Sequence, residues 1–216
     1  MPNASHPALI LASGSPRRRA LMAALELPYT VITSGADESL SPGLDPVEAV
    51  RMLALRKAEA VAAGLDSGLV IGSDTDVVLD DVILGKPADP ADAARMLRLL
   101  RGRTHRVISG VAVIDAASGE TRVGTVTTFV TMGDYTEAQI EDYAASGEPL
   151  DKAGAYAIQG LGSALVAGIE GCYNNVVGFP LCEVAALLGT FGVSANGASP
   201  VCTLPDGAPC PRVKKA

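Results

Sequence analysis

Residues 8–19 read ALILASGSPRRR, and this stretch decides the fold class. The apolar run at 8–12 predicts a buried strand. Ser15-Pro16 is typical of a helix N-cap followed by proline at the first helical position. A strand that leads through a short Ser/Gly loop into a helix is a building block of α/β proteins. The opening of the chain therefore predicts an α/β fold.

The rest of the chain continues this alternation and contains no internal repeat. Helices are predicted at residues 46–63, 90–101, 136–146 and 180–188, where start signals such as Asp-Pro precede helical patterns. Strands are predicted at residues 69–72, 77–79, 82–84, 106–114, 122–132, 165–169 and 176–177. The polar stretch at 148–160 is expected to connect a helix to a strand.

Composition limits the function classes. The 216 residues are 48% apolar, enough for one domain or for two small lobes that share a core. A net charge of −7 favours a single anionic metabolite over a nucleic acid, which usually needs a basic face. No apolar run approaches ~18 residues, so no membrane span is expected. None of the four cysteines forms a C-x-x-C pair, so we expect free thiols, no structural zinc and a cytoplasmic location.

The composition changes near the C-terminus. Residues 194–216 are rich in Gly, Ala, Pro and Ser and end in a basic cluster. We interpret residues 1–193 as the folded domain and residues 194–216 as a flexible tail.

Residues 13–19 carry the strongest chemical signal. A helix N-terminus has free N–H groups and a partial positive charge, so acidic side chains normally lie there. This helix instead begins with Arg17, Arg18 and Arg19. Together with Ser13 and Ser15 in the loop, they predict a phosphate-binding cradle. An ordinary Ser-Pro cap with solvated arginines is the alternative.

Two further signals lie on the next helix and strand. Lys57 shares a face of its helix with Val50, Ala54 and Val61, so it must reach water or meet a negative partner. Asp74 follows a predicted buried strand, and the carboxyl ends of strands are where ligands bind in open α/β sheets. A carboxylate there can hold a cation or orient a water, although Asp74 and Asp76 could also form a simple turn.

Three more residues complete the candidate site. Lys86 stands between Gly85 and Pro87, which restricts its position. Glu38 is a further candidate carboxylate in a loop. Gln159 offers both a donor and an acceptor, as reading the edge of a nucleotide base requires.

These pieces occur in the order and spacing of the Maf family, which the chain resembles over roughly residues 8–191. The matching stretches are SGSPRR at 13–18, ADE at 36–38, RKA at 56–58, GSDT at 72–75, GKP at 85–87, GRTH at 102–105, the whole of 148–160, and NVVGFPL at 175–181.

The resemblance implies a fold and a reaction. The fold is an elongated, twisted mixed sheet with flanking helices and two lobes around a cleft, similar to that of the inosine triphosphate pyrophosphatases. The reaction is hydrolysis of nucleoside triphosphates to monophosphate and pyrophosphate with a divalent cation, Mg²⁺ or Mn²⁺. Family members are often dimers, so a homodimer is possible; neither nucleic acid nor membrane is an expected partner.

The resemblance also implies residue roles. Asp74 accepts the proton of the attacking water, and Glu38 helps to hold the metal or the water. Arg17, Arg18, Lys57 and Lys86 bind the triphosphate.

Substrate choice follows from one segment. Residues 155–160 resemble the family branch that prefers dTTP, UTP and modified uridine triphosphates. In that branch Arg17, Thr75 and Gln159 match the positions linked to base choice. The alternatives are the 7-methyl-GTP branch and a nucleotide-binding regulator of cell division and septum formation.

Three residues depart from the family pattern: Ser73 replaces alanine, Phe179 replaces leucine, and Asp76 stands where an apolar residue is commoner. Asp76 adds a carboxylate beside the expected metal.

Overall fold

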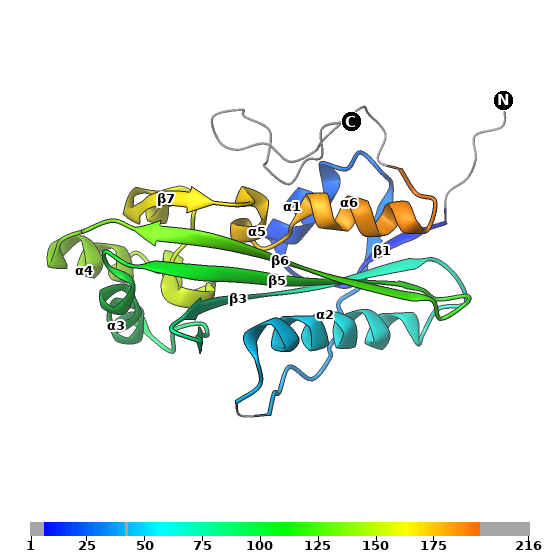
Figure 1. Cartoon of the computed structure of the whole chain (residues 1–216), viewed down its shortest axis with the longest axis horizontal. Helices are drawn as coiled ribbons and strands as arrows, with labels where there is room; N and C mark the ends of the chain where they lie inside the picture. The colour runs from blue at the N-terminus through cyan, green and yellow to red at the C-terminus, as the bar shows by residue number, and fades with distance from the viewer. Residues whose placement is uncertain (1–6, 42, 195–216) are drawn as a thin grey trace.

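The computed structural model describes residues 7–41 and 43–194 (Figure 1). Its centre is a seven-stranded mixed sheet in the order β2-β1-β3-β5-β6-β7, with β4 paired to β3. The strands are β1 (Leu9–Leu11), β2 (Tyr29–Val31), β3 (Leu69–Leu79), β4 (Val82–Leu84), β5 (Thr104–Asp115), β6 (Thr121–Met132) and β7 (Val166–Glu170). The predicted mixed α/β fold is confirmed.

Helices lie on both faces of this sheet. They are α1 (Pro16–Ala23), α2 (Pro46–Ala62), α3 (Pro90–Leu100), α4 (Glu137–Ala145), α5 (Tyr173–Val177) and α6 (Leu181–Thr190), with 3₁₀ helices η1 (Glu148–Asp151), η2 (Ala153–Ala155) and η3 (Gly160–Leu165). The capping predictions hold: Ser15 caps α1 by accepting the Arg18 N–H at 3.4 Å, and Thr136 forms a capping box with Gln139.

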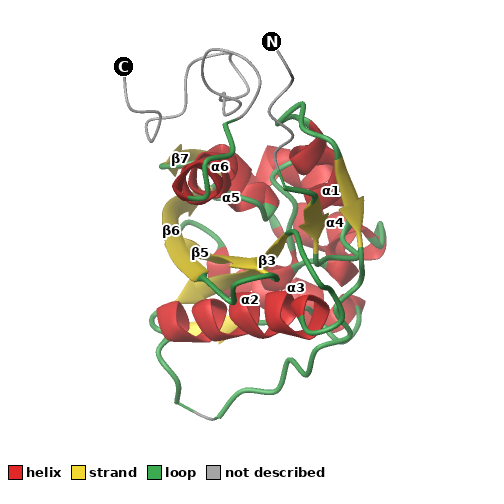
Figure 2. Cartoon of the chain, turned by 90° about the vertical axis from the view of Figure 1, so that its right-hand side faces the viewer, coloured by secondary structure: helices red, strands yellow, loops and turns green. Residues whose placement is uncertain are grey.

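The long strands β3, β5 and β6 form the length of the molecule. In Figure 1, α2 runs below them, α1 and α6 lie above, and α3 and α4 gather at one end. The view along the sheet in Figure 2 shows the same two helical layers. Separate apolar clusters fill the two ends, one around α1, α6 and β1, the other around α3 and α4.

The prediction of two short strands at 69–72 and 77–79 was wrong. A single strand, β3, runs through Asp74 and Asp76, so neither residue lies in a turn or at the end of a strand. Antiparallel β5 pairs with β3 from Leu69 to Val78. This continuous ladder outweighs the low strand propensity of aspartate.

Two other predictions need correction. Residues 176–177 were expected in a strand, but they end helix α5, which stops at Gly178 in the left-handed conformation with φ 113°. The edge strand β2 was not predicted, because three residues give too short a pattern. The predicted tail at 194–216 lies outside the described residues, apart from Ser194. In the part of the chain that the structure describes, no helix could span a membrane.

Two glycines determine how closely α2 lies against the sheet. A Cβ on Gly72 of β3 would stand 2.2 Å from the Ala54 carbonyl oxygen, and a Cβ on Gly110 of β5 would stand 2.2 Å from that of Val50. Both contacts are with helix backbone, so a side chain at either strand position would push α2 away. The glycines thus set the distance at which side chains of α2 meet β3.

We predict that Gly110→Ala destabilises the protein by at least ~1–3 kcal/mol, the usual range for overpacking. For a protein of this size this lowers Tm by roughly 2–4 °C per kcal/mol. Thermal and urea unfolding measure the change. Gly189→Ala on α6 is the matched control, because a Cβ there meets nothing within 4 Å. Equal stability of Gly110→Ala and the wild type would contradict this account of α2 packing.

Candidate functional site

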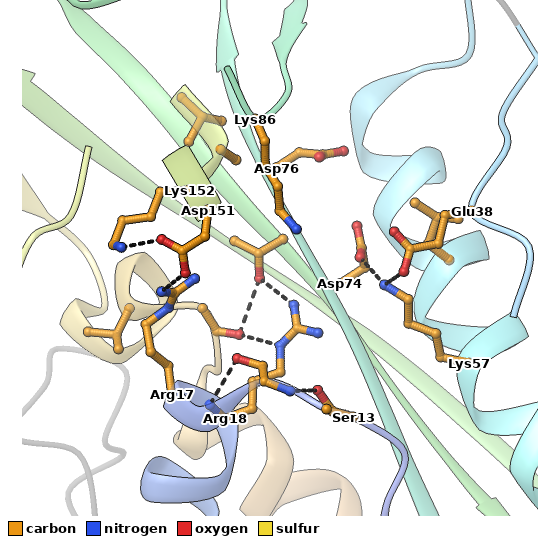
Figure 3. A pocket seen from close by; sticks show the side chains of 18 of the residues that line it. Ser13, Arg17, Arg18, Glu38, Lys57, Asp74, Asp76, Lys86, Asp151 and Lys152 are labelled. Carbon is orange, nitrogen blue, oxygen red and sulfur yellow. Dashed lines mark hydrogen bonds and ion pairs between the residues drawn. The ribbon is translucent and has the colours of Figure 1, made fainter. Parts of the chain in front are cut away.

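A cavity of about 780 Å³ opens beside β3, where the shorter β1 ends. Loops that follow β1 and β2 line one side, and the β4 end and residues 151–159 line the other (Figure 3). The cavity therefore lies at the carboxyl ends of β1 and β2, as expected for an open α/β sheet, while β3 contributes side chains from its middle. All ten residues proposed from the sequence line this cavity: Ser13, Ser15, Arg17, Arg18, Glu38, Lys57, Asp74, Thr75, Lys86 and Gln159.

Lys57 joins the two predicted carboxylates. Its Nζ lies 2.6 Å from Asp74 Oδ1 and 2.9 Å from Glu38 Oε1. Lys57 and Asp74 are only 7% and 8% exposed. The sequence left open whether Lys57 reaches water or meets a negative partner, and the structure shows the negative partner. The hydrogen bond from Lys57 lowers the pKa of Glu38, although partial burial opposes it.

Asp76 is the electrostatically unfavourable member of the site. It lies two residues from Asp74 on β3, and both side chains line the cavity. Burial, followed by the negative charge of Asp74, raises the pKa of Asp76 to about 6 from its ordinary value of 3.8. The folded protein therefore disfavours the ionised form of Asp76.

The carboxylates fit a divalent cation by their chemistry. Among residues 7–41 and 43–194, no three His, Cys, Asp or Glu side chains are already arranged to hold a metal ion. Mg²⁺ binds proteins through one or two carboxylates and completes its shell with water and substrate phosphates, so a preformed cage is not required. The repulsion between Asp74 and Asp76 is the feature that a bound cation would relieve.

Arg18 connects α1 to the sheet. It donates to the carbonyl oxygens of Ser73 (2.6 Å) and Gly178 (2.9 Å) and to Thr75 Oγ1 (3.4 Å). An arginine carries five N–H donors, so these contacts leave donors for a phosphate. Burial lowers the pKa of Arg18, yet a guanidinium stays charged at physiological pH.

The loop between β1 and α1 presents an anion-binding surface. Ser13 accepts the Ser15 N–H at 3.2 Å, which shapes the loop. The first turn of α1 contains no acidic residue. The dipole of α1 and the arginine side chains therefore add their positive potentials at the cavity.

Arg17 is held from across the cavity. Its Nη1 lies 3.0 Å from Asp151 Oδ2, and Lys152 lies 2.5 Å from the other oxygen of Asp151. We did not predict a role for Asp151, Lys152 or Ser109 from the sequence. The mixed charges of 148–160 were a signal for the first two. Nothing in the sequence indicated Ser109, whose hydroxyl lies 2.7 Å from that of Thr75.

We predict that Asp76→Asn raises the Tm of the metal-free protein by about 2–4 °C at pH 8, which corresponds to ~1 kcal/mol at this size. The folded pKa of Asp76 lies above its unfolded value, so its ionisation destabilises the fold progressively above pH ~4 and fully above pH ~6. The difference in Tm should therefore shrink as the pH falls from 7 to 5.

Calorimetric scans in EDTA between pH 5 and 8 measure this difference. Added Mg²⁺ should stabilise the wild type more than the variant. A variant that is no more stable than the wild type at pH 8 would show that the ionised Asp76 does not destabilise the fold.

Known proteins are similar to this chain over most of its length. The Maf-like protein family matches residues 8–191. A protein of Moorella thermoacetica named dTTP/UTP pyrophosphatase is 57% identical over 189 residues, 88% of this chain and 97% of that protein. Proteins with the same name from Pelotomaculum thermopropionicum (52% over 184 residues; 85% and 96% of the chains) and Deinococcus radiodurans (48% over 197; 91% and 100%) are also similar.

Among solved structures, the Ham1 protein of Staphylococcus aureus matches with a TM-score of 0.42 and 20% identity. The match covers 59% of this chain and 72% of that one.

Proposed function

The chain belongs to the Maf family, and from this premise we propose that it hydrolyses nucleoside triphosphates to nucleoside monophosphate and pyrophosphate. We propose dTTP, UTP and modified uridine triphosphates as the favoured substrates, in a role that clears unwanted nucleotides. Relatives named dTTP/UTP pyrophosphatase, matched over nearly their whole length, support this choice.

One observation carries the proposal: a buried carboxylate and its lysine stand in a cavity lined by further cations. Asp74 is held by Lys57 at 2.6 Å, while Arg17, Arg18 and Lys86 line the same cavity. A triphosphate needs the cations, and an attacking water needs the carboxylate. A site that only bound the anion would gain nothing from a buried negative charge, which repels phosphate.

The proposed reaction is a single displacement at the α-phosphorus. Asp74 orients a water and takes its proton while the water oxygen bonds to the α-phosphorus. The bond between that phosphorus and the bridging oxygen to the β-phosphate breaks, and pyrophosphate leaves with the electron pair. Lys57 holds the Asp74 carboxylate in place through its 2.6 Å hydrogen bond while the proton is transferred.

The cationic side chains stabilise the leaving group. Pyrophosphate gains negative charge as it departs, and the side chains of Arg17, Arg18 and Lys86 line the cavity where they can balance that charge. Arg17 must exchange its contact with Asp151 for a phosphate, so its side chain changes partner when the substrate binds. The Ser13–Ser15 loop and the start of α1 offer N–H groups to the same phosphates.

We propose that Mg²⁺ or Mn²⁺ is held by Asp74 with help from Asp76 or Glu38. Such a cation supplies charge neutralisation at the phosphates and lowers the pKa of a bound water. Both Glu38 and Asp74 contact Lys57, so the lysine sets how far these carboxylates can turn toward an ion.

We assign base choice to Gln159. Gln159 lines the cavity together with Arg17 and Thr75. Uracil and thymine present an N–H between two carbonyl oxygens, and a carboxamide can pair with both kinds of group.

The test is a pyrophosphate-release assay with Mg²⁺ or Mn²⁺ on dTTP, UTP, CTP, GTP, ITP and 7-methyl-GTP. We expect turnover of dTTP and UTP above the others. Asp74→Asn should lower kcat by about 10²–10⁴-fold, the usual contribution of a general base, and should leave nucleotide affinity largely intact.

The outcomes separate the alternatives. Preferred turnover of 7-methyl-GTP would move the chain to the other substrate branch. Tight nucleotide binding without hydrolysis of any substrate would favour the regulatory role over the enzyme. Near-normal turnover by Asp74→Asn would overturn the mechanism.

A further inference from the structure

Residues 156–159 form part of the cavity wall, and we call residues 156–160 the base-facing segment. Tyr156, Ala157, Ile158 and Gln159 all line the cavity. The segment has no regular secondary structure before η3 begins at Gly160. Something outside the segment must therefore keep Gln159 in place.

The backbone that enters the segment is strained. Ala155 is buried and has a φ of 58°, a conformation that non-glycine residues rarely adopt. Gly154 before it has a φ of 69°, and a Cβ there would stand 2.7 Å from Val77 Cγ1. Such backbone conformations persist only when surrounding contacts enforce them.

The first enforcing contact is a buried pair between two rings. Tyr156 Oη lies 2.8 Å from His105 Nε2, and the rings meet edge to face with centroids 5.3 Å apart. His105 and Tyr156 are 2% and 5% exposed. Burial lowers the pKa of His105 to about 4, so the imidazole is neutral near pH 7. The pair attaches the start of the segment to strand β5.

The second contact is a phenol that links both ends of the segment. Tyr143 Oη of α4 accepts the Ala157 N–H at 3.0 Å and donates to the carboxylate of Glu148. Glu148 in turn accepts the N–H groups of Leu161 (3.2 Å) and Gly162 (3.0 Å). One chain of hydrogen bonds therefore holds the residues on both sides of Gln159.

We propose that His105 and Tyr143 are positioning residues that set base selectivity by holding the base-facing segment. The proposal rests on the proposed function of the site. Neither side chain lines the cavity, so both act through the segment and not through contact with the nucleotide. The phosphate-binding groups stand on α1, α2, β3 and the loop after β4, so loosening the segment should affect base discrimination more than bond cleavage.

Removing single hydroxyl groups tests the proposal. Tyr143→Phe and Tyr156→Phe keep the rings and remove the hydroxyl contacts that hold the segment. Tyr135→Phe is the matched control, because Tyr135 lies in the same apolar cluster but donates its hydroxyl to the Leu97 carbonyl at 2.7 Å and not to a residue of the segment. Tyr156→Phe and Tyr135→Phe each lose one buried hydrogen bond and Tyr143→Phe loses its contacts with Ala157 and Glu148, so all three should lose stability, about 0.5–1.5 kcal/mol per hydrogen bond.

The readout is kcat/KM for dTTP, UTP, CTP and GTP. We expect Tyr143→Phe and Tyr156→Phe to reduce the preference for dTTP over CTP by about fivefold or more, the factor that one hydrogen bond provides. The change should appear mainly in KM. Tyr135→Phe should retain the wild-type preference. Unchanged preference in the first two variants, or an equal loss in all three, would overturn the proposal.

Calorimetric binding of the same nucleotides separates this proposal from the proposed function. Binding preference requires no turnover, so it reports on the segment even if the wild type hydrolyses nothing. Absence of pyrophosphate release would overturn the proposed function alone. A binding preference that Tyr143→Phe leaves intact would overturn the positioning role alone.

Discussion

The ion pair between Lys57 and Asp74 places two opposite charges, 2.6 Å apart, in a largely dehydrated part of the molecule. The Asp74 carboxylate depends on Lys57 there, because an unpaired buried charge costs several kcal/mol. The pair therefore requires that helix α2 and strand β3 keep a fixed separation. Gly72 and Gly110 provide it, since any side chain at these positions would collide with the backbone of α2.

The short strand β1 makes the pair accessible to a ligand. β1 pairs with β3 only up to Leu11 opposite Ile71, so Asp74 and Asp76 stand beyond its end. The chain leaves β1 through a serine-rich loop into α1, which directs N–H groups and arginines toward the same space. The end of β1 thus brings the Asp74 carboxylate of β3 into the same cavity as the start of α1. Burial and the nearby Asp74 raise the pKa of Asp76 to about 6, so this arrangement makes ionisation of Asp76 unfavourable.

Local signals in the sequence predicted much of the fold. Ser15-Pro16, Asp45-Pro46 and Thr136 mark helix starts by contacts within four residues, and the structure confirms each start. Long-range pairing was less predictable. Whether Lys57 met water or a carboxylate depended on a residue 17 positions away, and Arg17 pairs with Asp151 across 134 positions. Asp74 was expected at a strand end because the ladder with β5 leaves no mark on the local pattern.

The most direct test of the central claim follows the oxygen of the attacking water. Hydrolysis of dTTP in H₂¹⁸O, with mass analysis of both products, reports which phosphorus is attacked. The account predicts ¹⁸O in thymidine monophosphate and none in pyrophosphate, because Asp74 directs water to the α-phosphorus. Label in pyrophosphate, or release of orthophosphate in its place, would contradict it.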